Sequence, residues 1–282
     1  MSDRDPANEP EIRILPDPEA CAAAAAQWLA ASLVEAAAAR GTAYWATTGG
    51  SAPAAIYRRL AVAPLRDEVP WEQVLLWWGD DRFVPFDHPL SNVAIAYADL
   101  LDVGATSGES GTGASGVDVL AGRSAGAPIH AGNVHPFPIP QAIAEGQGPD
   151  WTAERYVEML RADGPPTEGG WPAFDILFLG IGPDGHCLSV FPDSEAFDSD
   201  AIALGIPAPT HVEPHVARVT LNPRVVDTAR KVLVVAHGAE KADVLGAILG
   251  AERDVRRLPA QLARRTGATW ILDEAAAARL PR

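Results

Sequence analysis

The residues best suited to proton transfer follow an apolar segment near the middle of the chain. Residues 174–192 read FDILFLGIGPDGHCLSVFP, a run of apolar side chains that ends in glycines and delivers Asp184 and His186. Such a run is typical of a strand buried on both faces of a parallel sheet. Ligands of open α/β sheets bind outside the carboxyl ends of the strands, so we expect His186, which can take up a proton near neutral pH, to lie near a ligand.

The glycines of this segment allow two other interpretations. Gly180, Gly182 and Gly185 spell the G-x-G-x-x-G fingerprint of dinucleotide-binding loops, which requires a helix at the third glycine and an acidic residue about twenty positions later. Here the chain continues as a loop, and Pro183 lacks an amide for a pyrophosphate, which disfavours a nicotinamide cofactor. A tight turn whose histidine only caps or packs is the structural alternative.

A second chemical segment follows the strand predicted over residues 42–47. Gly49, Gly50 and Ser51 come directly after it, and Pro53 then favours the start of a helix. Unpaired backbone amides at a helix N-terminus attract anions, so this loop could hold an oxyanion. An ordinary strand-to-helix turn is the plainer interpretation when the loop is taken alone.

Charged residues lie at similar places elsewhere in the chain. They are Asp81 and Arg82 after the strand predicted over residues 73–78, Arg218 within the strand predicted over 216–221, and Lys241 in the first turn of a predicted helix. A lysine there opposes the helix dipole unless an anion lies nearby. Asp81 and Arg82 alone could also form a solvated turn with an internal ion pair.

The joint pattern is more specific than any of its parts. A phosphate monoester carries two negative charges that several donors must match, and glycine amides, arginine and lysine together provide such donors. A histidine that this anchoring does not require suggests proton transfer on the rest of the ligand. The sequence therefore predicts a site for a phosphorylated small molecule.

These segments must be positioned by alternating strands and helices. Strands are predicted over residues 11–15, 42–47, 73–78, 134–138, 174–179, 216–221, 231–236 and 268–272. Helices are predicted over residues 18–40, 54–60, 91–101, 151–161 and 239–250, after Pro223, and in the Ala-rich C-terminal segment. The alternation predicts an α/β fold with a doubly wound, mostly parallel sheet and helices on both faces.

Composition limits the classes of function. The 282 residues are 48% hydrophobic and 21% charged, as in globular proteins. The formal net charge of −15 argues against binding to nucleic acid or to an anionic membrane, and an anionic ligand would need a local basic site. Two cysteines, Cys21 and Cys187, cannot form a disulfide framework, which suits a reducing cytoplasm. Cys187 is expected to be an inert small side chain.

Targeting, membrane and metal signals are weak. Residues 1–10 have no apolar core of a signal peptide, and residues 20–39 form an Ala-rich stretch that fits a buried helix better than a membrane span. His211 and His215 have the spacing of a metal pair on a helix, but Pro214 between them would break that helix. No metal is therefore expected.

No composition break divides the chain, and residues 1–282 are predicted to form one domain. Residues 1–10 are expected to be a disordered start. Residues 103–133 are rich in Gly, Ser and Ala and are expected to be a flexible insertion.

Five segments resemble the signature blocks of the 6-phosphogluconolactonase family, in order and across almost the whole chain. They read TTGGSAP, GDDRFVP followed by HPLSN, LGIGPDGHCLSVFP, RVTLNP and HGAEKADVL. The resemblance implies a Rossmann-like fold and hydrolysis of 6-phospho-D-glucono-1,5-lactone to 6-phospho-D-gluconate in the pentose phosphate pathway. It also implies a cytoplasmic enzyme without an obligatory cofactor, and we expect a monomer or weak dimer.

Site roles follow from the same resemblance. It implies that His186 is the catalytic base, that Asp184 is the aspartate of the D-G-H motif, and that Arg82 is the active-site arginine. The family's phosphate contacts correspond to the loop Gly49–Ser51, Arg218 and Lys241. The acidic residue that precedes the family's active-site arginine corresponds to Asp81, which is therefore counted among the substrate-binding residues. The family commonly has Thr at the position of Ala52 and Glu at the position of Asp81. Asp81 is shorter than Glu by one methylene group, which disfavours a direct contact of its carboxylate with the ligand.

Two competing functions remain open at this stage. An amino-sugar-6-phosphate deaminase or isomerase shares the fold and the D-G-H motif. In those enzymes, however, the second loop reads D-E-Y, where this chain has Arg82 in place of the tyrosine, and a further glutamate occupies the position of Phe191. A non-catalytic sugar-phosphate-binding protein would keep the ligand site without turnover.

Overall fold

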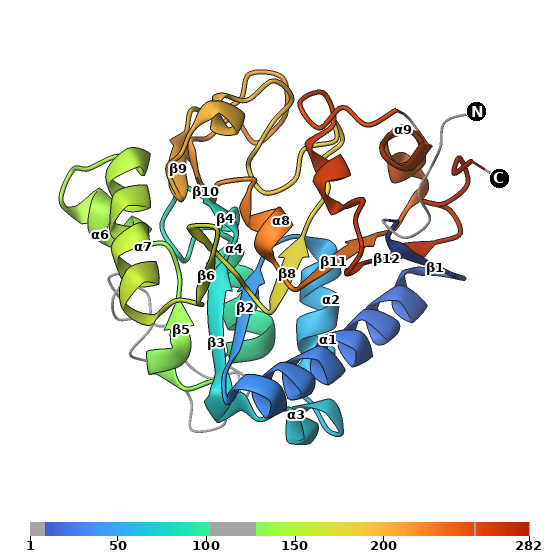
Figure 1. Ribbon diagram of the computed structural model, residues 1–282, viewed down its shortest axis with the longest axis horizontal. Helices are drawn as coiled ribbons and strands as arrows, with labels where there is room; N and C mark the ends of the chain where they lie inside the picture. Colours follow the sequence, from blue (N-terminus) through green and yellow to red (C-terminus); the bar gives the residue numbers. More distant parts are fainter. Residues whose placement is uncertain (1–8, 102–127, 251, 282) are drawn as a thin grey trace.

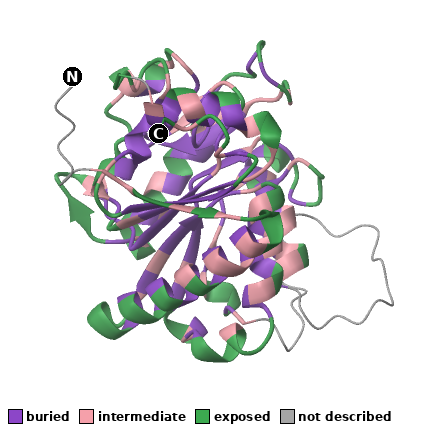
Figure 2. Ribbon diagram, turned by 90° about the vertical axis from the view of Figure 1, so that its right-hand side faces the viewer, coloured by how far each residue is buried: buried purple, intermediate pink, exposed green. Residues whose placement is uncertain are grey.

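A seven-stranded sheet forms the centre of the computed structural model, which describes residues 9–101, 128–250 and 252–281 (Figure 1). Neighbouring strands of this sheet all run parallel. Figure 2 shows the mainly buried strands running between helices and loops. In spatial order the strands are β1 (Glu11–Leu15), β12 (Ala268–Asp273), β11 (Lys231–Ala236), β8 (Ile176–Leu179), β2 (Ala43–Thr47), β3 (Val74–Trp78) and β5 (Val134–His135).

The strand order confirms the predicted doubly wound sheet. From β2 the chain moves outward through β3 to β5, then returns to place β8 on the other side of β2 and continues outward through β11 and β12. The winding therefore reverses between β2 and β8. In open α/β sheets, the crevice outside the carboxyl ends at such a reversal is where ligands bind.

Apolar side chains bury the central strands on both faces. All four residues of β8 are buried, and Trp45, Trp77 and Trp270 are fully buried in β2, β3 and β12. A strand without a polar face has no alternative to the sheet interior, which explains the near-continuous apolar runs of the sequence. The ends of β2 and β8 are thus held rigidly by the core.

The helices connect the strands. Their bounds are α1 (Pro18–Arg40), α2 (Ser51–Leu60), α3 (Leu65–Glu68), α4 (Asn92–Ala96), α6 (Ile139–Ala144), α7 (Pro149–Asp163), α8 (Val225–Thr228) and α9 (Ala242–Gly250). Single turns of other helix types lie at residues 71–73, 97–101, 131–133, 195–198, 239–241 and 259–263.

Helix α1 begins and ends where the sequence predicts. The carboxylate of Asp17 accepts a hydrogen bond from the amide of Ala20 at 2.8 Å, and Gly41 takes a left-handed conformation at the other end. The helix is long and apolar enough to cross a membrane by composition, but 56% of its most apolar window is buried inside the protein, where it packs on α2 and β12.

A separate small sheet was not predicted. It pairs β4 (Asp80–Arg82), β10 (Arg218–Leu221) and β9 (Ala203–Ile206) in antiparallel fashion, with β10 in the middle. The strand predicted over 216–221 therefore exists, but it lies outside the parallel sheet. Residues 80–82, predicted as a turn, form a strand because they pair with β10 directly after β3 ends. A short hairpin of β6 (Thr167–Glu168) and β7 (Trp171–Pro172) completes the strands of the described residues.

Other predictions were wrong at their boundaries or in type. Helix α2 begins at Ser51 and not at Ala54, and α7 begins at Pro149 after Gly148. The predicted C-terminal helix is absent from the described residues, where residues 274–280 form turns. Most helical stability in proteins comes from tertiary packing of an apolar face, so the helix propensity of this Ala-rich segment is not enough to make it a helix.

The predicted disorder of residues 1–10 and flexibility of residues 103–133 fall mainly outside the described residues. Within the described part, Ile129 is fully buried and residues 131–133 form a helical turn, so residues 129–133 belong to the packed structure.

Candidate active site

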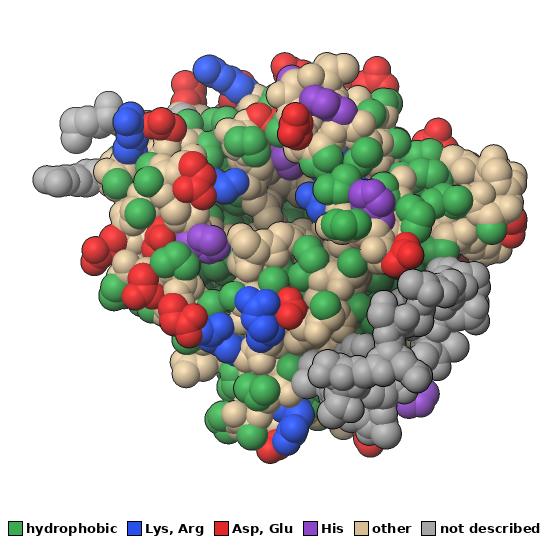
Figure 3. All heavy atoms as spheres, turned by 180° about the vertical axis from the view of Figure 1, so that it is seen from behind, with side chains coloured by type: hydrophobic (Ala, Val, Ile, Leu, Met, Phe, Trp, Pro, Cys, Tyr) green, Lys and Arg blue, Asp and Glu red, His purple; other side chains and the backbone are tan. Residues whose placement is uncertain are grey.

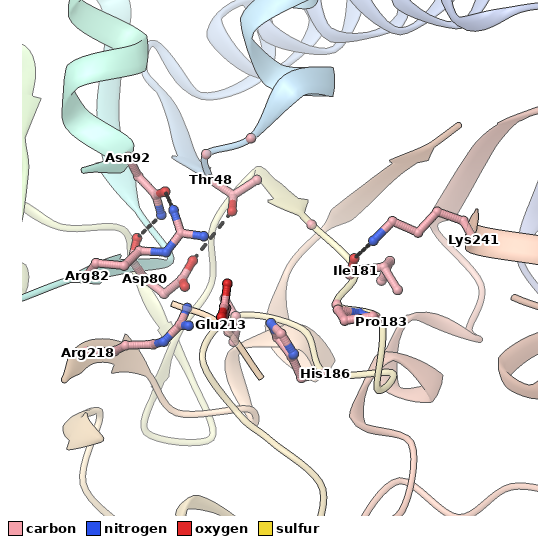
Figure 4. A pocket seen from close by; sticks show the side chains of 15 residues that line it. Thr48, Asp80, Arg82, Asn92, Ile181, Pro183, His186, Glu213, Arg218 and Lys241 are labelled. Atoms are coloured by element: carbon pink, nitrogen blue, oxygen red, sulfur yellow. Dashed lines mark hydrogen bonds between the residues drawn. The ribbon is translucent and has the colours of Figure 1, made fainter. Parts of the chain in front are cut away.

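A cavity of about 240 Å³ lies outside the carboxyl ends of β2 and β8 (Figure 4). Gly49 and Gly50 line it from the loop after β2, and residues 180–183 and His186 line it from the loop after β8. The cavity therefore occupies the crevice at which the winding of the sheet reverses. Two of its cations, Arg82 and Arg218, come from the small sheet.

Figure 3 shows a hollow on one face of the molecule with basic and histidine side chains around it, among scattered acidic ones. The cavity is lined by three basic side chains, Arg82, Arg218 and Lys241, and by two acidic ones, Asp80 and Glu213. On a chain with a formal net charge of −15, this is the local basic site that an anionic ligand requires.

His186 is held by the carboxylate two residues before it. Its Nδ1 lies 2.5 Å from Oδ1 of Asp184, and its backbone amide donates to the same oxygen at 3.2 Å. With the ionised carboxylate at Nδ1, that nitrogen carries the proton and Nε2 is left as an acceptor. The geometry thus suits His186 as a base.

Burial by itself would raise the pKa of Asp184, but the hydrogen bonds and charge of His186, together with a hydrogen bond from His211, lower it well below its ordinary value. Asp184 therefore stays ionised throughout the neutral range. An ionised partner stabilises the imidazolium that forms when His186 accepts a proton.

Gly182 leaves the space that the imidazole occupies. A Cβ atom at this position would lie 2.0 Å from Nδ1 and 2.1 Å from Cε1 of His186. The amide of Gly182 also donates a hydrogen bond to the carbonyl of His186 at 2.9 Å. The glycine is therefore required by the close approach of the ring, and not by a dinucleotide phosphate.

Arg82 is fixed by the start of α4. Its Nη1 donates to Oδ1 of Asn92 at 2.7 Å and to the carbonyl of Leu90 at 3.2 Å. Asn92 in turn donates to the carbonyl of Asp80 at 2.8 Å and touches Gly49, where a Cβ would meet Oδ1 of Asn92 at 2.0 Å. A single amide side chain thus connects the glycine loop to the arginine.

Arg82 and Arg218 are register partners on neighbouring strands. Like charges directly opposite one another destabilise a sheet, so an anion bound between the two guanidinium groups would offset their repulsion. Arg218 is only 2% exposed, and burial lowers its pKa from the ordinary value, while Asp80 opposes that shift. Among the described residues, the Nε atoms of both arginines have no hydrogen-bond partner. Unpaired donors of this kind favour binding of an oxyanion.

Asp81 does not lie where a ligand contact would require. It is fully buried outside the cavity lining, and its carboxylate accepts hydrogen bonds from the amides of Arg82 and Asn92, each at 2.7 Å, and from the hydroxyl of Ser91 at 3.2 Å. Burial raises the pKa of Asp81 to about 7, although the hydrogen bonds from these two amides act in the opposite direction and lower it. Successive side chains of a strand point to opposite sides, so Asp80 and Arg82 reach the cavity and Asp81 does not.

We predict that Asp81→Ala lowers the free energy of unfolding by about 2–4 kcal/mol, because two buried amides lose their acceptor. Asp81→Asn keeps an acceptor oxygen and is expected to cost less. Urea denaturation of the three proteins measures the difference. If Asp81 instead bound the ligand, Asp81→Asn would raise KM with unchanged stability.

Ser51, Gly50 and Lys241 line an adjoining cavity of about 160 Å³, which shares Gly49, Gly50 and Lys241 with the first. Ser51 is the first residue of α2, so the free amides of the helix N-terminus lie here. The hydroxyl of Ser51 lies 3.5 Å from Nε2 of His237. Burial lowers the pKa of Lys241, whose Nζ donates to the carbonyl of Ile181 at 2.8 Å.

The structure therefore brings the predicted site residues together with one exception, Asp81. One cavity is lined by His186, Arg82, Arg218, Gly49, Gly50 and Lys241. Asp184 contacts Nδ1 of His186, and Ser51 lines the adjoining cavity. In Figure 4, Lys241 lies on the side of His186 opposite to Arg82 and Arg218.

Several residues were missed by sequence reasoning. Thr48, Asp80, Asn92 and Glu213 line the cavity, and His211 contacts Asp184. Asn92 follows directly after the predicted helix cap Ser91, ten residues after Arg82 in the sequence. This position near the loop GDDR is a signal by which Asn92 could have been predicted as a site residue. No local pattern marks Glu213 or His211, because they come from an irregular segment.

The other residues considered for chemistry are Cys187, His211 and His215. Cys187 is fully buried, and burial raises the pKa of its thiol to about 12, so the thiolate is absent near neutral pH. His211 and His215 do not act as a pair, since His215 contacts the carbonyl of Pro209 at 2.7 Å. In the described part of the chain no group of three or more His, Cys, Asp or Glu residues could hold a metal ion.

Comparisons with known proteins place the chain in a family. The family model described as glucosamine-6-phosphate isomerases/6-phosphogluconolactonase matches residues 16–271. The chain is 31% identical to a 6-phosphogluconolactonase of Streptomyces coelicolor over 97% of this chain and 95% of that protein. It is also 31% identical to one of Mycobacterium tuberculosis, over 96% and 98%.

A solved structure is similar along nearly its whole length. It is the 6-phosphogluconolactonase of Trypanosoma brucei, which superposes with a TM-score of 0.76 at 27% identity and covers 97% of this chain and 100% of that one.

Proposed function

The chain belongs to the family of glucosamine-6-phosphate isomerases and 6-phosphogluconolactonases, and from this premise we propose that it hydrolyses 6-phospho-D-glucono-1,5-lactone to 6-phospho-D-gluconate. The observation that carries the proposal is the position of His186. Its ring is oriented by Asp184 in a cavity that also presents Arg82, Arg218 and Lys241. A base beside several cations fits an ester with a phosphate group.

The lactone is an activated ester, so water needs a positioned base and stabilisation of the oxyanion. Nε2 of His186 accepts a proton from the water that attacks C1, and a tetrahedral oxyanion forms. Arg82 offsets the developing charge. The C1–O bond to the ring oxygen then breaks, and His186 returns its proton to that oxygen, which becomes the hydroxyl of the acid.

Phosphate recognition is assigned to the glycine loop and to the cations beside it. The amides of Gly49, Gly50 and Ser51 lie at the N-terminus of α2, where the helix dipole favours an anion. Lys241 and Arg218 line the cavity on either side of that loop. Binding energy from this remote group orients C1 toward His186, so it contributes to turnover as well as to affinity.

The assignment extends to the cellular setting. The reaction belongs to the pentose phosphate pathway, and we propose a cytoplasmic enzyme that acts as a monomer or weak dimer on a phosphorylated sugar lactone, without nucleic-acid or membrane partners. The acidic net charge of −15 supports the last point, since it repels other polyanions.

Acid release from freshly prepared phosphogluconolactone, corrected for spontaneous opening, tests the function. The wild-type protein is expected to accelerate opening in proportion to its concentration. Absence of acceleration together with tight binding of 6-phosphogluconate in calorimetry would instead indicate a non-catalytic sensor. Ammonia release from glucosamine 6-phosphate would indicate the deaminase function.

Lys241→Met is expected to raise KM for the phosphorylated lactone about tenfold or more and to lower kcat as well, because the dianion loses one charge-assisted donor. Unphosphorylated gluconolactone should be hydrolysed by the variant at nearly the wild-type kcat/KM. Lys231→Met provides the control, since Lys231 pairs with Glu35 on the surface. Equal losses on both lactones would show that Lys241 supports the loop at Ile181 and not the phosphate.

A further inference from the structure

Two histidines share the carboxylate of Asp184. Oδ1 lies 2.5 Å from Nδ1 of His186, and Oδ2 lies 3.0 Å from Nε2 of His211. His211 comes from residues 207–217, the irregular segment between β9 and β10, and so from the small sheet's side of the cavity. The carboxylate thus connects the loop after β8 with a segment distant in sequence.

An aromatic ring fixes the spacing of the two histidines. The ring of Phe191 lies 4.7 Å from that of His186 and 5.5 Å from that of His211, which it meets edge-on at 84°. Phe191 is only 7% exposed, and the guanidinium of Arg218 covers it at 5.2 Å. Edge contacts of this kind are favourable and directional, so Phe191 limits how far either imidazole can turn.

The segment that carries His211 is itself anchored. Val212 is buried, His215 contacts the carbonyl of Pro209 at 2.7 Å, and Arg218 donates to the carbonyl of Pro214 at 3.2 Å. Glu213, from the same segment, lines the cavity near His186 (Figure 4). His211 is therefore presented to Asp184 by a fixed segment, although about half of its side chain (52%) is exposed to solvent.

We propose that His211 is a positioning residue for the lactone hydrolysis proposed above, on which this inference rests. It donates its Nε2 proton to Oδ2 of Asp184 and prevents that carboxylate from rotating. Asp184 then presents Oδ1 to His186 in one orientation, and Nε2 of His186 remains aimed into the cavity. His211 contacts neither the attacking water nor the lactone in this scheme.

Two substitutions test the hydrogen bond from His211 to Asp184. His211→Phe keeps an aromatic edge against Phe191 but has no donor, and its kcat is expected to fall roughly tenfold, less than the hundredfold of a full 1 Å displacement, with little change in KM. His211→Gln carries an amide nitrogen at similar reach and should restore most of kcat.

His215→Phe is the matched control, since it changes a histidine of the same segment that does not contact Asp184. The proposal is overturned if His211→Phe keeps kcat within twofold of wild type, if His215→Phe is equally slow, or if His211→Gln is as slow as His211→Phe. Thermal denaturation checks that the variants are folded.

A measurement without turnover keeps this inference separate from the proposed function. Imidazole ¹⁵N NMR reports which nitrogen of His186 carries the proton. The Nδ1–H tautomer should dominate in the wild type and lose dominance in His211→Phe. An unchanged tautomer refutes the role of His211, whereas an inactive wild type with the expected tautomer shift refutes only the lactonase assignment.

Discussion

Replacing His186 by Ala is expected to lower kcat for the lactone by on the order of a hundredfold or more, because general-base assistance to the attacking water is lost. KM should change little, since the phosphate donors remain at Gly49–Ser51 and Lys241. The side chain is 14% exposed and lines the cavity, so the substitution enlarges the cavity. Steady-state kinetics with correction for spontaneous opening measures the effect.

The control for this substitution is His237→Ala, because His237 lines the adjoining cavity beside Ser51 without contacting Asp184. It should keep kcat close to the wild-type value. Lactone opening by His186→Ala at a rate close to wild type would show that another group, or water alone, transfers the proton, and the scheme for ester cleavage would fail.

Gly182→Ala is expected to have an effect of similar size without removing any catalytic group. The added Cβ would lie 2.0 Å from Nδ1 of His186, so the ring must shift and lose its 2.5 Å contact with Asp184. A displacement of about 1 Å can cost about a hundredfold in rate. We therefore expect a large fall in kcat with a smaller change in KM.

Gly148→Ala is a suitable comparison, since a Cβ at Gly148 meets nothing within 4 Å. That variant should retain wild-type kinetics. Wild-type kcat in Gly182→Ala would mean that the ring can turn away from the added methyl and still act, and it would disprove the claim that this glycine exists for the imidazole.

Local signals in the sequence were enough to predict the large sheet and the catalytic loop. The apolar runs of β2, β3, β8, β11 and β12 have no polar face, and glycines mark where the chain leaves β2 and β8. Parallel strands bring such exits to the same edge of a sheet. The loop at Gly49 and the side chain of His186 could therefore be placed together from the sequence alone.

The small sheet could not be predicted in this way. β4 consists of Asp80, Asp81 and Arg82, which have no apolar alternation and become a strand only through pairing with β10, more than a hundred residues away. Without that pairing, nothing indicates which of the two aspartates faces the cavity. The assignment of Asp81 to the ligand was wrong for this reason, and Asp80 was overlooked.

Contacts between distant segments account for the remaining omissions. Asn92 reaches Gly49 and Arg82 across the crevice, and His211 reaches Asp184 from a segment without regular structure. Each contact depends on the tertiary path of a loop. The packing of the folded protein sets such paths, so no local pattern of residue types predicts them.

The division of the cavity between two sheets has an evolutionary consequence. Asp184 and His186, to which we assign proton transfer, follow β8 of the large sheet, whereas Arg82 and Arg218 lie on the three-stranded sheet beside it. Substitutions of the cavity-facing side chains of the small sheet could change which metabolite is accepted, whereas its buried Asp81 must be kept for stability. Descendants of such a scaffold can thus diversify in substrate choice while they keep the strand ends of the large sheet.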